Sequence, residues 1–360
     1  LEYAKDTLVA ELTTDETGSA TIKNLPLGNY RVVEKTAPDG FVHNKAEQNV
    51  QFVYVDQDTP AVVESVEFIN ERQKVEISVE KQDAENGSTI AGAEFGLYAK
   101  EDIKAGGKVI VKADEQLCTA VTGEDGTAIF EQNLPFGSYY IKELQAPDGF
   151  VSSDEIIEVT VSYQGQDVEV VRLKEIFKNQ PTTVEFRKSD LTTGVELDGA
   201  TLTVLDKDGN EIDKWTSVKG EPHIIKRLHV GETYILREEF APYGYLKAEE
   251  VEFTITDTAE IQKVEMKDDV PIGRIIINKK GEFLSEVSWN DMVAGAMDSI
   301  WGYVTGSLKD VTFEIYARED IKAADGESDD YYKKDELVAT IKTDELGIAR
   351  TDDLPLGKYY

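Results

Sequence analysis

The sequence predicts an all-β protein built from tandem β-sandwich modules, and three observations support this fold class. Short segments in which apolar and polar residues alternate recur along the 360-residue chain. Such alternation places the apolar side chains on one face of a strand. Turn signals containing Gly and Asp separate these segments. Two longer motifs return at intervals of about one domain, which predicts a repeated module.

Six segments show the alternation most clearly, and their composition is typical of strands. They are rich in Val, Ile, Phe, Tyr and Thr, which fit a pleated surface. Their density, about seven strands per hundred residues without a long helical pattern, favours β-sandwiches. In chain order they are Val75–Lys81, Ala93–Ala99, Glu155–Tyr163, Val184–Lys188, Ala200–Asp206 and Val251–Thr256.

The first repeated motif is Leu-Pro-x-Gly-x-Tyr. A hairpin signal in which Asp or Glu is closely followed by Gly precedes most copies, as in TGEDGTA, and Gly adopts the positive φ of such turns at low cost. The copies begin at Leu25, Leu134 and Leu354, with a looser version, LHVGETY, at Leu228.

The second motif is an apolar strand followed by an Ala-Pro-x-Gly-aromatic turn, here called the AP-G turn. One glutamate stands three positions before each turn. A carboxylate in an apolar strand is costly to bury, so we expect it to have a chemical role. The three glutamates are Glu34, Glu143 and Glu238.

The repeats divide the chain into four predicted modules: residues 1–73, 74–181, 182–272 and 273–360. The first lacks its initial strands and the last lacks its final ones. The connections are short and are not rich in Gly or Ser, which favours a stiff, monomeric rod.

The fourth module carries an insertion at about 282–307. Its apolar residues recur at steps of three and four, which predicts a short amphipathic helix over Val287–Val304. The helix would pack on its own sandwich or, alternatively, offer a docking surface. The periodic residues are Trp289, Met292, Val293, Ala296, Ile300 and Val304.

Composition excludes several classes of function. The chain has 71 acidic and 38 basic residues and a net charge of −33, which argues against nucleic acid as a partner. No apolar run is long enough to span a membrane. Its one cysteine, Cys118, excludes a disulfide framework. No spacing typical of a metal or cofactor site appears, so we expect neither.

Three positions in each complete module combine charge with an apolar setting. A lysine ends the first strand, on the same face as the apolar residues before it. The glutamate precedes the AP-G turn, and an amide or acid closes the last strand. In the second module these are Lys81, Glu143 and Asn179; in the third they are Lys188, Glu238 and Asp268, with Asp269 as an alternative.

These residues resemble the Cna B-type, or SpaA-like, repeat domains of Gram-positive surface proteins and pilins, which have an Ig-like, prealbumin-like sandwich fold. The similarity rests on the terminal lysine, on GAEFGLYA at 92–99, on Leu-Pro-x-Gly-x-Tyr, on the glutamate with its AP-G turn, and on the closing Asn or Asp. It covers essentially the whole chain except the insertion.

The resemblance implies a spontaneous intramolecular isopeptide bond in each complete module, Lys81–Asn179 and Lys188–Asp268. Glu143 and Glu238 would be the catalytic carboxyls. Burial favours the neutral, nucleophilic form of a lysine and the protonated form of a carboxyl. The first module has Glu34 and Asn70 but no matching lysine, and the fourth has Lys279, with Lys280 as an alternative.

The resulting expectation is a structural stalk or pilus-like segment at the cell surface of a Gram-positive bacterium, in contact with its neighbouring modules and without membrane insertion. One alternative is an adhesin that binds a host or bacterial partner through loops or the inserted helix. Head-to-tail completion of the partial modules between chains is another. An enzyme with an external substrate is not expected, because no Ser/His/Asp order, metal cluster or phosphate loop is present.

Overall fold

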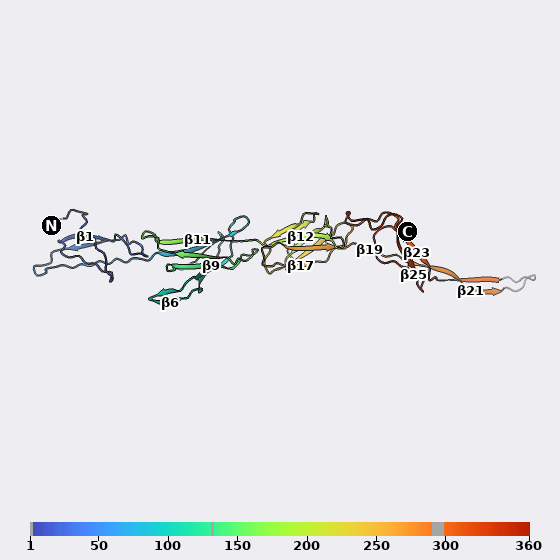
Figure 1. The fold of residues 1–360 in the computed structure, drawn as a ribbon, viewed down its shortest axis with the longest axis horizontal. Coiled ribbons are helices and arrows are strands. Elements are labelled where there is room, and N and C mark those ends of the chain that lie inside the picture. The colour runs from blue at the N-terminus through green and yellow to red at the C-terminus, as the bar shows by residue number, and fades with distance from the viewer. Residues whose placement is uncertain (1–2, 131–132, 290–298) are drawn as a thin grey trace, which may run out of the picture. The chain divides into compact units, whose positions relative to one another are not determined.

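The computed structural model of the protein describes residues 3–130, 133–289 and 299–360. These residues form strands, turns and bends and contain no helix (Figure 1). The predicted all-β fold is therefore confirmed. The chain divides into two compact units, Leu1–Pro147 with Ser152–Asn179, and Asp148–Val151 with Gln180–Tyr360.

The second module is a sandwich of two sheets. One sheet has the strand order β10-β9-β4-β7 and the other β11-β3-β8, while β5 and β6 form a separate hairpin. The strands are β3 (Lys74–Asp83), β4 (Glu94–Ala99), β5 (Ile103–Ala105), β6 (Lys108–Val111), β7 (Gln116–Val121), β8 (Thr127–Phe130), β9 (Gly137–Gln145), β10 (Ile156–Val161) and β11 (Val170–Asn179).

The alternation in the sequence explains how this sandwich closes. Along β3 every second residue is buried, from Val75 to Asp83. Apolar side chains from both sheets, including Phe95, Phe130 and Phe177, form one core. Burial of one face of each sheet against the other removes apolar surface from water and stabilises the pair.

The third module repeats this arrangement with two fewer strands. Its sheets have the orders β15-β12-β18 and β14-β13-β16-β17 around a second core. The strands are β12 (Thr183–Asp190), β13 (Thr201–Leu205), β14 (Glu211–Thr216), β15 (His223–Lys226), β16 (Thr233–Phe240), β17 (Val251–Thr254) and β18 (Gln262–Asp268).

The first and last segments contain less sheet structure. In the first, β1 (Gly28–Val33) pairs with β2 (Glu47–Phe52). In the fourth, four two-stranded ladders form: β19–β26, β20–β25, β21–β22 and β23–β24. Their bounds are Ile272–Gly273 (β19), Ile276–Asn278 (β20), Lys280–Trp289 (β21), Ser299–Ser307 (β22), Thr312–Tyr316 (β23), Leu337–Lys342 (β24), Ile348–Arg350 (β25) and Leu354–Pro355 (β26).

The predicted helix over Val287–Val304 is wrong for the residues that the structure describes. Trp289 lies in β21, and Ile300 and Val304 lie in β22 of an antiparallel ribbon. Met292, Val293 and Ala296 fall outside the described residues. The strands are rich in aromatic and β-branched residues, which favour a pleated ribbon, and Gly302 and Gly306 disfavour a helix.

Parallel pairing of the first and last strands positions the candidate site in each sandwich. In the second module β3 pairs with β11, and in the third β12 pairs with β18. Lys81 is opposite Phe177, two residues before Asn179. Lys188 is opposite Met266, two residues before Asp268. With a period of two, each lysine and its acceptor therefore lie on the same face.

Candidate functional site: a buried lysine, carboxyl and acceptor

The second module brings Lys81, Glu143 and Asn179 together inside the sandwich. The Lys81 side chain is fully buried, and that of Glu143 is 1% exposed. Lys81 Nζ donates a hydrogen bond to Asn179 Oδ1 and lies 2.8 Å from Glu143 Oε1. Asn179 Nδ2 donates to both carboxyl oxygens of Glu143 at 2.9 Å. Each group therefore contacts the other two.

Aromatic rings surround the amine. Lys81 Nζ lies 5.6 Å from the ring centroid of Phe95 and 6.0 Å from that of Phe177. Burial lowers the pKa of Lys81, and the hydrogen bond and charge of Glu143 oppose this shift without cancelling it. The neutral form of the Lys81 amine is therefore more populated than that of a lysine on the surface.

The third module contains the same arrangement with a different acceptor. The side chains of Lys188, Glu238 and Asp268 are all fully buried. Lys188 Nζ donates to Asp268 Oδ1 and lies 3.0 Å from Glu238 Oε1. Asp269 is exposed and its carboxyl accepts from the backbone amide of Val270. Of the two alternatives, only Asp268 contacts the lysine.

The two buried carboxyls of the third module share one cation, Lys188. Glu238 Oε1 is ion-paired with Lys188 but makes no other polar contact, and Asp268 Oδ2 is buried without a hydrogen-bond partner. The pKa of Asp268 is raised to about 6, because burial and the neighbouring Glu238 raise it more than Lys188 lowers it. A proton on Asp268 Oδ2 would make this oxygen a hydrogen-bond donor and would remove a negative charge beside the lysine.

In the first module the glutamate and the amide are paired in the same way. Asn70 Nδ2 donates to Glu34 Oε2 at 2.8 Å, and also to the carbonyl of Val42. Both side chains are half-buried. Among the contacts of the described residues, neither is paired with a lysine.

In the fourth module the structure distinguishes Lys279 from Lys280. The amide of Lys279 donates to the carbonyl of Gly347, as that of Lys81 does to Gly126. Its carbonyl accepts from Leu308, as that of Lys81 does from Ile90. Lys280 instead begins β21. Lys279 thus has the backbone position of Lys81, but it is exposed.

One component of the site was missed in the sequence: a backbone amide that binds the carboxyl. The residue ten positions after each glutamate donates its N–H to Oε2, at distances of 2.6, 2.9 and 2.7 Å. The donors are Asn44, Ser153 and Ala248. Their side chains share no chemistry, so only the constant spacing could have revealed them.

The tyrosine of Leu-Pro-x-Gly-x-Tyr holds the turn that leads into the glutamate strand. Its hydroxyl donates to the carbonyl of the proline four residues earlier, at 2.8, 2.7 and 2.6 Å for Tyr30, Tyr139 and Tyr359. Burial raises the pKa of Tyr139 to about 12, so the hydroxyl remains a donor. In the looser copy, Tyr234 accepts from the amide of His229 instead.

Each AP-G turn pairs with the chain that follows the acceptor. The residue two positions after the turn glycine donates to the carbonyl of the residue after the acceptor, in the pairs Val42–Glu71, Val151–Gln180 and Leu246–Asp269. The turn therefore does more than end its strand. It fixes the segment that leaves the acceptor.

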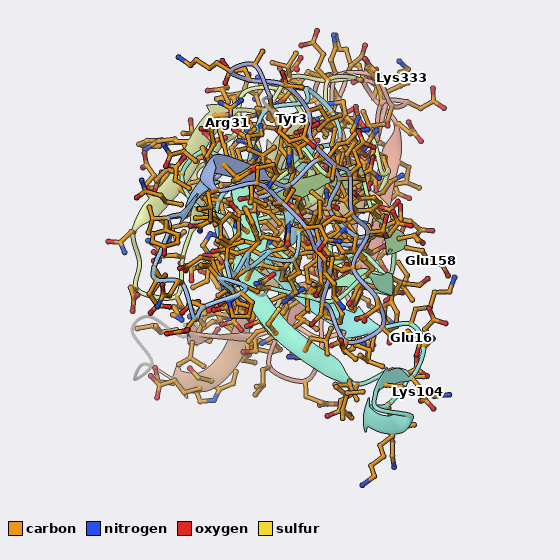
Figure 2. All side chains as sticks on the ribbon, turned by 90° about the vertical axis from the view of Figure 1, so that its left-hand side faces the viewer. Tyr3, Glu16, Arg31, Lys104, Glu158 and Lys333 are labelled. Carbon is orange, nitrogen blue, oxygen red and sulfur yellow. The ribbon has the colours of Figure 1, made fainter. Side chains whose placement is uncertain are left out.

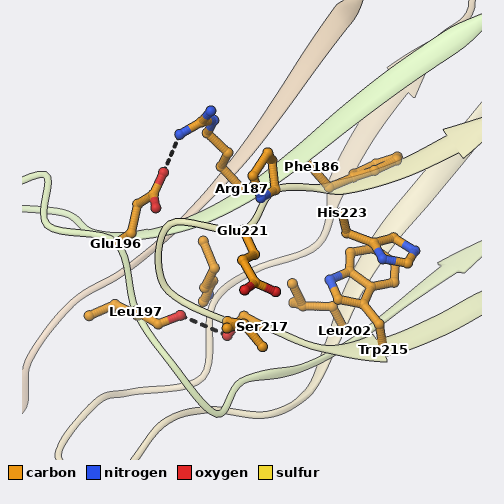
Figure 3. A pocket seen from close by; sticks show the side chains of 12 residues that line it. Phe186, Arg187, Glu196, Leu197, Leu202, Trp215, Ser217, Glu221 and His223 are labelled. Atoms are coloured by element: carbon orange, nitrogen blue, oxygen red, sulfur yellow. Dashed lines mark hydrogen bonds and ion pairs between the residues drawn. The ribbon is translucent and has the colours of Figure 1, made fainter.

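The small pocket in Figure 3 lies in the third module, and side chains that line it contact one another. His223 stacks on Trp215 with ring centroids 4.1 Å apart. Arg187 pairs with Glu196, and the Ser217 hydroxyl donates to the carbonyl of Leu197. The polar groups named here are therefore engaged with one another.

In the part of the chain that the structure describes, no group of three or more His, Cys, Asp or Glu side chains could hold a metal ion. None of the residues 3–130, 133–289 and 299–360 forms a helix long and apolar enough to cross a membrane.

Fold and site together define a class of protein: tandem β-sandwiches in which a lysine of the first strand, an amide or acid of the last strand and a carboxyl from the other sheet are buried together. The family model described as the SpaA, prealbumin-like fold domain matches residues 1–67, 75–175 and 182–270. These matches cover more than half of the chain, which therefore belongs to this family. A comparison with curated proteins found no match.

Several solved structures are similar in fold. The Bacillus anthracis TIE protein is 23% identical with a TM-score of 0.43, covering 88% of this chain and 48% of its own, so this chain spans about half its length. A streptococcal ancillary pilin is 23% identical with a TM-score of 0.26, covering 69% and 76%. The shaft pilin SpaA from Lactobacillus rhamnosus GG is 15% identical with a TM-score of 0.26, covering 55% and 98%.

Proposed function

We propose that this chain is a structural segment of a Gram-positive surface protein or pilus, stiffened by Lys81–Asn179 and Lys188–Asp268 isopeptide bonds. The observation that carries the proposal is the burial of each lysine amine in hydrogen-bond contact with its acceptor and beside a carboxyl. A buried charge of this kind is costly unless paired, and a covalent bond removes the charge altogether.

In the second module the reaction is an exchange of amides. Glu143 takes a proton from Lys81, and the neutral amine attacks Cγ of Asn179. A C–N bond forms, the attacking nitrogen gives up a second proton, and the bond to Nδ2 breaks. One of the two protons passes through Glu143 to Nδ2, so that ammonia leaves, and the other remains on Glu143. The fold aligns the three groups in advance, which can contribute roughly 7–11 kcal/mol toward the barrier.

In the third module the acceptor is an acid and the leaving group is water. Glu238 takes a proton from Lys188, and the neutral amine attacks Cγ of protonated Asp268 to form the C–N bond. Glu238 gives its proton to the departing hydroxyl, which leaves as water, and then takes the second proton of the attacking nitrogen. The raised pKa of Asp268 supports this route, because a neutral carboxyl is a better electrophile than a carboxylate.

The position of the bonds suits a protein under tension. Each bond joins the first and last strands of its module, through which force enters and leaves. Tension entering β3 at Lys74 would pass from Lys81 to Asn179 and bypass the 97 residues between them. Closing loops of this size stabilises by about 4–5 kcal/mol in the entropic model used for disulfides.

Intact-protein mass spectrometry tests the proposal. The chain should weigh less than its sequence by one ammonia and one water. Lys81→Ala should restore the ammonia only and Lys188→Ala the water only. Lys279→Ala is the matched control, because this exposed lysine contacts no acceptor, and it should retain both deficits. A wild-type mass equal to that of the sequence would exclude both bonds.

Glutamate variants test the catalytic assignment. Glu143→Gln preserves the size of the side chain but cannot carry the proton, so it should retain the ammonia mass. Glu34→Gln, in a module whose described residues supply no lysine to the glutamate, should leave both deficits unchanged. An unchanged mass deficit in Glu143→Gln would show that the bond forms without this carboxyl.

A further inference from the structure

The inserted ribbon of β21 and β22 has a face that the rest of the described chain does not use. The two strands pair only with each other in the part of the chain that the structure describes. In Figure 1, β21 extends away from β23 and β25 of the same unit. Large apolar side chains on the ribbon are exposed, including Trp289 at 63% and Trp301 at 53%.

The register assigns these side chains to two faces. Leu284 is opposite Tyr303, Val287 opposite Trp301, and Trp289 opposite Ser299. Opposite residues share a face, and so do alternate residues of a strand. One face, here called the aromatic face, therefore carries Leu284, Val287, Trp289, Trp301 and Tyr303.

The opposite face is covered in part by its own side chains. The Phe283 ring lies over Gly306, 2.8 Å from where a Cβ would stand. The aliphatic part of Glu286 lies over Gly302 in the same way, at 2.7 Å. This face also carries the charge of Glu286. The exposed tryptophans and Tyr303 all lie on the aromatic face, whereas the exposed apolar residues of the opposite face are Phe283, Ile300 and Val304.

Charge restricts what could cover the aromatic face. The strand β22 has no charged residue, and no Lys or Arg occurs between Lys280 and Lys309. The charged residues on the aromatic face are Lys280 and Glu282, which lie at the base of the ribbon opposite Ser307 and Thr305. Beyond Lys280, an anionic partner would find no cation on this face. Insertion into hydrocarbon is disfavoured because the outer edges of a two-stranded ribbon lack backbone partners.

We propose that the aromatic face packs against the same face of a second copy of this chain. The part of this face beyond its base is aromatic and uncharged, so it is complementary to itself, and a two-fold axis places equal patches opposite each other. Face-to-face packing of two ribbons resembles the packing of two sheets in a sandwich. The interaction uses side chains outside the crosslink sites and does not depend on the isopeptide bonds.

The size of the patch indicates a weak dimer. Three half-exposed aromatic side chains with Leu284 and Val287 offer on the order of 500 Å² per copy. The total of roughly 1,000 Å² is at the lower limit for specific interfaces. A net charge of −33 on each copy opposes the approach. Association should therefore rise with protein concentration and become tighter as salt screens the repulsion.

Sedimentation equilibrium of the full chain over a range of concentrations and NaCl tests this inference. Trp301→Thr with Tyr303→Thr removes the aromatic side chains and retains strand propensity. This pair should weaken association at least tenfold. The matched control, Ile300→Thr with Val304→Thr, changes the opposite face of the same strand and should stay within about threefold of wild type.

Three outcomes would overturn the proposal. The wild-type chain could remain monomeric at all concentrations and salt levels, as a simple rod would. The two double variants could weaken association equally. Association could also fall with rising salt, which would assign it to charge contacts. Retained mass deficits in every variant would show that the second and third modules still fold, so that a loss of association is not due to their unfolding.

Discussion

At the scale of residues, the sites of the two complete modules differ in the number of carboxyl groups beside the lysine. The site of Lys81 has one carboxyl and a neutral amide, whereas that of Lys188 has two carboxyls. The second site therefore has one more carboxyl beside its lysine. Burial is the largest cause of the raised pKa of Asp268, and the neighbouring Glu238 raises it further.

This difference predicts a pH dependence for one bond. As pH rises through about 6, Asp268 loses the proton that makes it an electrophile, so Lys188–Asp268 bond formation should slow. In this limb of the pH–rate profile, above about pH 6, the rate of bond formation should fall by up to about tenfold for each pH unit. The rate can be followed by peptide mass spectrometry after unfolded, uncrosslinked chain is refolded at set pH values.

Asp268→Asn is the control for this experiment. An amide does not titrate in this range, so the limb near pH 6 should vanish and ammonia should replace water as the leaving group. If wild type and Asp268→Asn slow equally as pH rises, the limb does not belong to Asp268.

Some features of the two sites could be predicted from the sequence, and others could not. Lys81 and Lys188 were predicted to lie on the apolar face because alternation is a local property. That Asp268 is buried and Asp269 exposed depends on the register of β18 against β12, a contact between distant parts of the chain. The amides of Asn44, Ser153 and Ala248 were missed because any residue type can supply a backbone N–H.

At the scale of elements, the inserted segment shows the limit of periodicity. Trp289, Ile300 and Val304 fit steps of three and four, yet the structure places them in a ribbon. Ile300 and Val304 also fit a period of two along β22, where they share a face with Gly302. A short segment satisfies both patterns, and glycine content and aromatic residues decide between them.

The AP-G turn of the second module yields a prediction at this scale. Gly149 has φ +80°, and a Cβ there would lie 2.7 Å from the carbonyl oxygen of Arg227. Its carbonyl also accepts from the amide of Thr182. Gly149→Ala should therefore combine backbone strain with a clash and cost about 2–4 kcal/mol. Hydrogen exchange at the Thr182 amide should accelerate in this variant.

Gly209→Ala is the matched control for the turn. Gly209 has φ +83° but open space around its Cβ position, so this variant should show only the strain of about 1–2 kcal/mol. Equal destabilisation of the two variants, with unchanged exchange at Thr182, would contradict the conclusion that the AP-G turn fixes the segment that follows the acceptor.

At the scale of the whole molecule, charge is the dominant property. The sequence has 33 more acidic than basic residues, and the labelled Lys104, Glu158 and Lys333 lie at the outer edge of the view in Figure 2. Many ion pairs are exposed, such as Lys100–Glu158 and Lys309–Glu345. Pairs of this kind contribute little each, so net repulsion should outweigh them.

Salt should therefore raise the thermal stability of the full chain. Screening over about 10 Å at 0.1 M weakens repulsion between unpaired acids more than it weakens close pairs. The transition temperature, followed by calorimetry, should increase from low salt to about 0.5 M NaCl, with the same trend in KCl. A decrease would show that exposed ion pairs contribute more than the net charge costs.

The sequence by itself determined the all-β class, the repeated module and its membership of a family, because alternation, turn residues and repeated motifs are local or periodic signals. Only the tertiary structure decided which groups touch. Lys81 and Asn179 are 98 positions apart, and parallel pairing of β3 and β11 brings them into contact. The structure of the ribbon likewise depends on the pairing of its two strands, and the pattern of residues along one segment cannot specify that pairing.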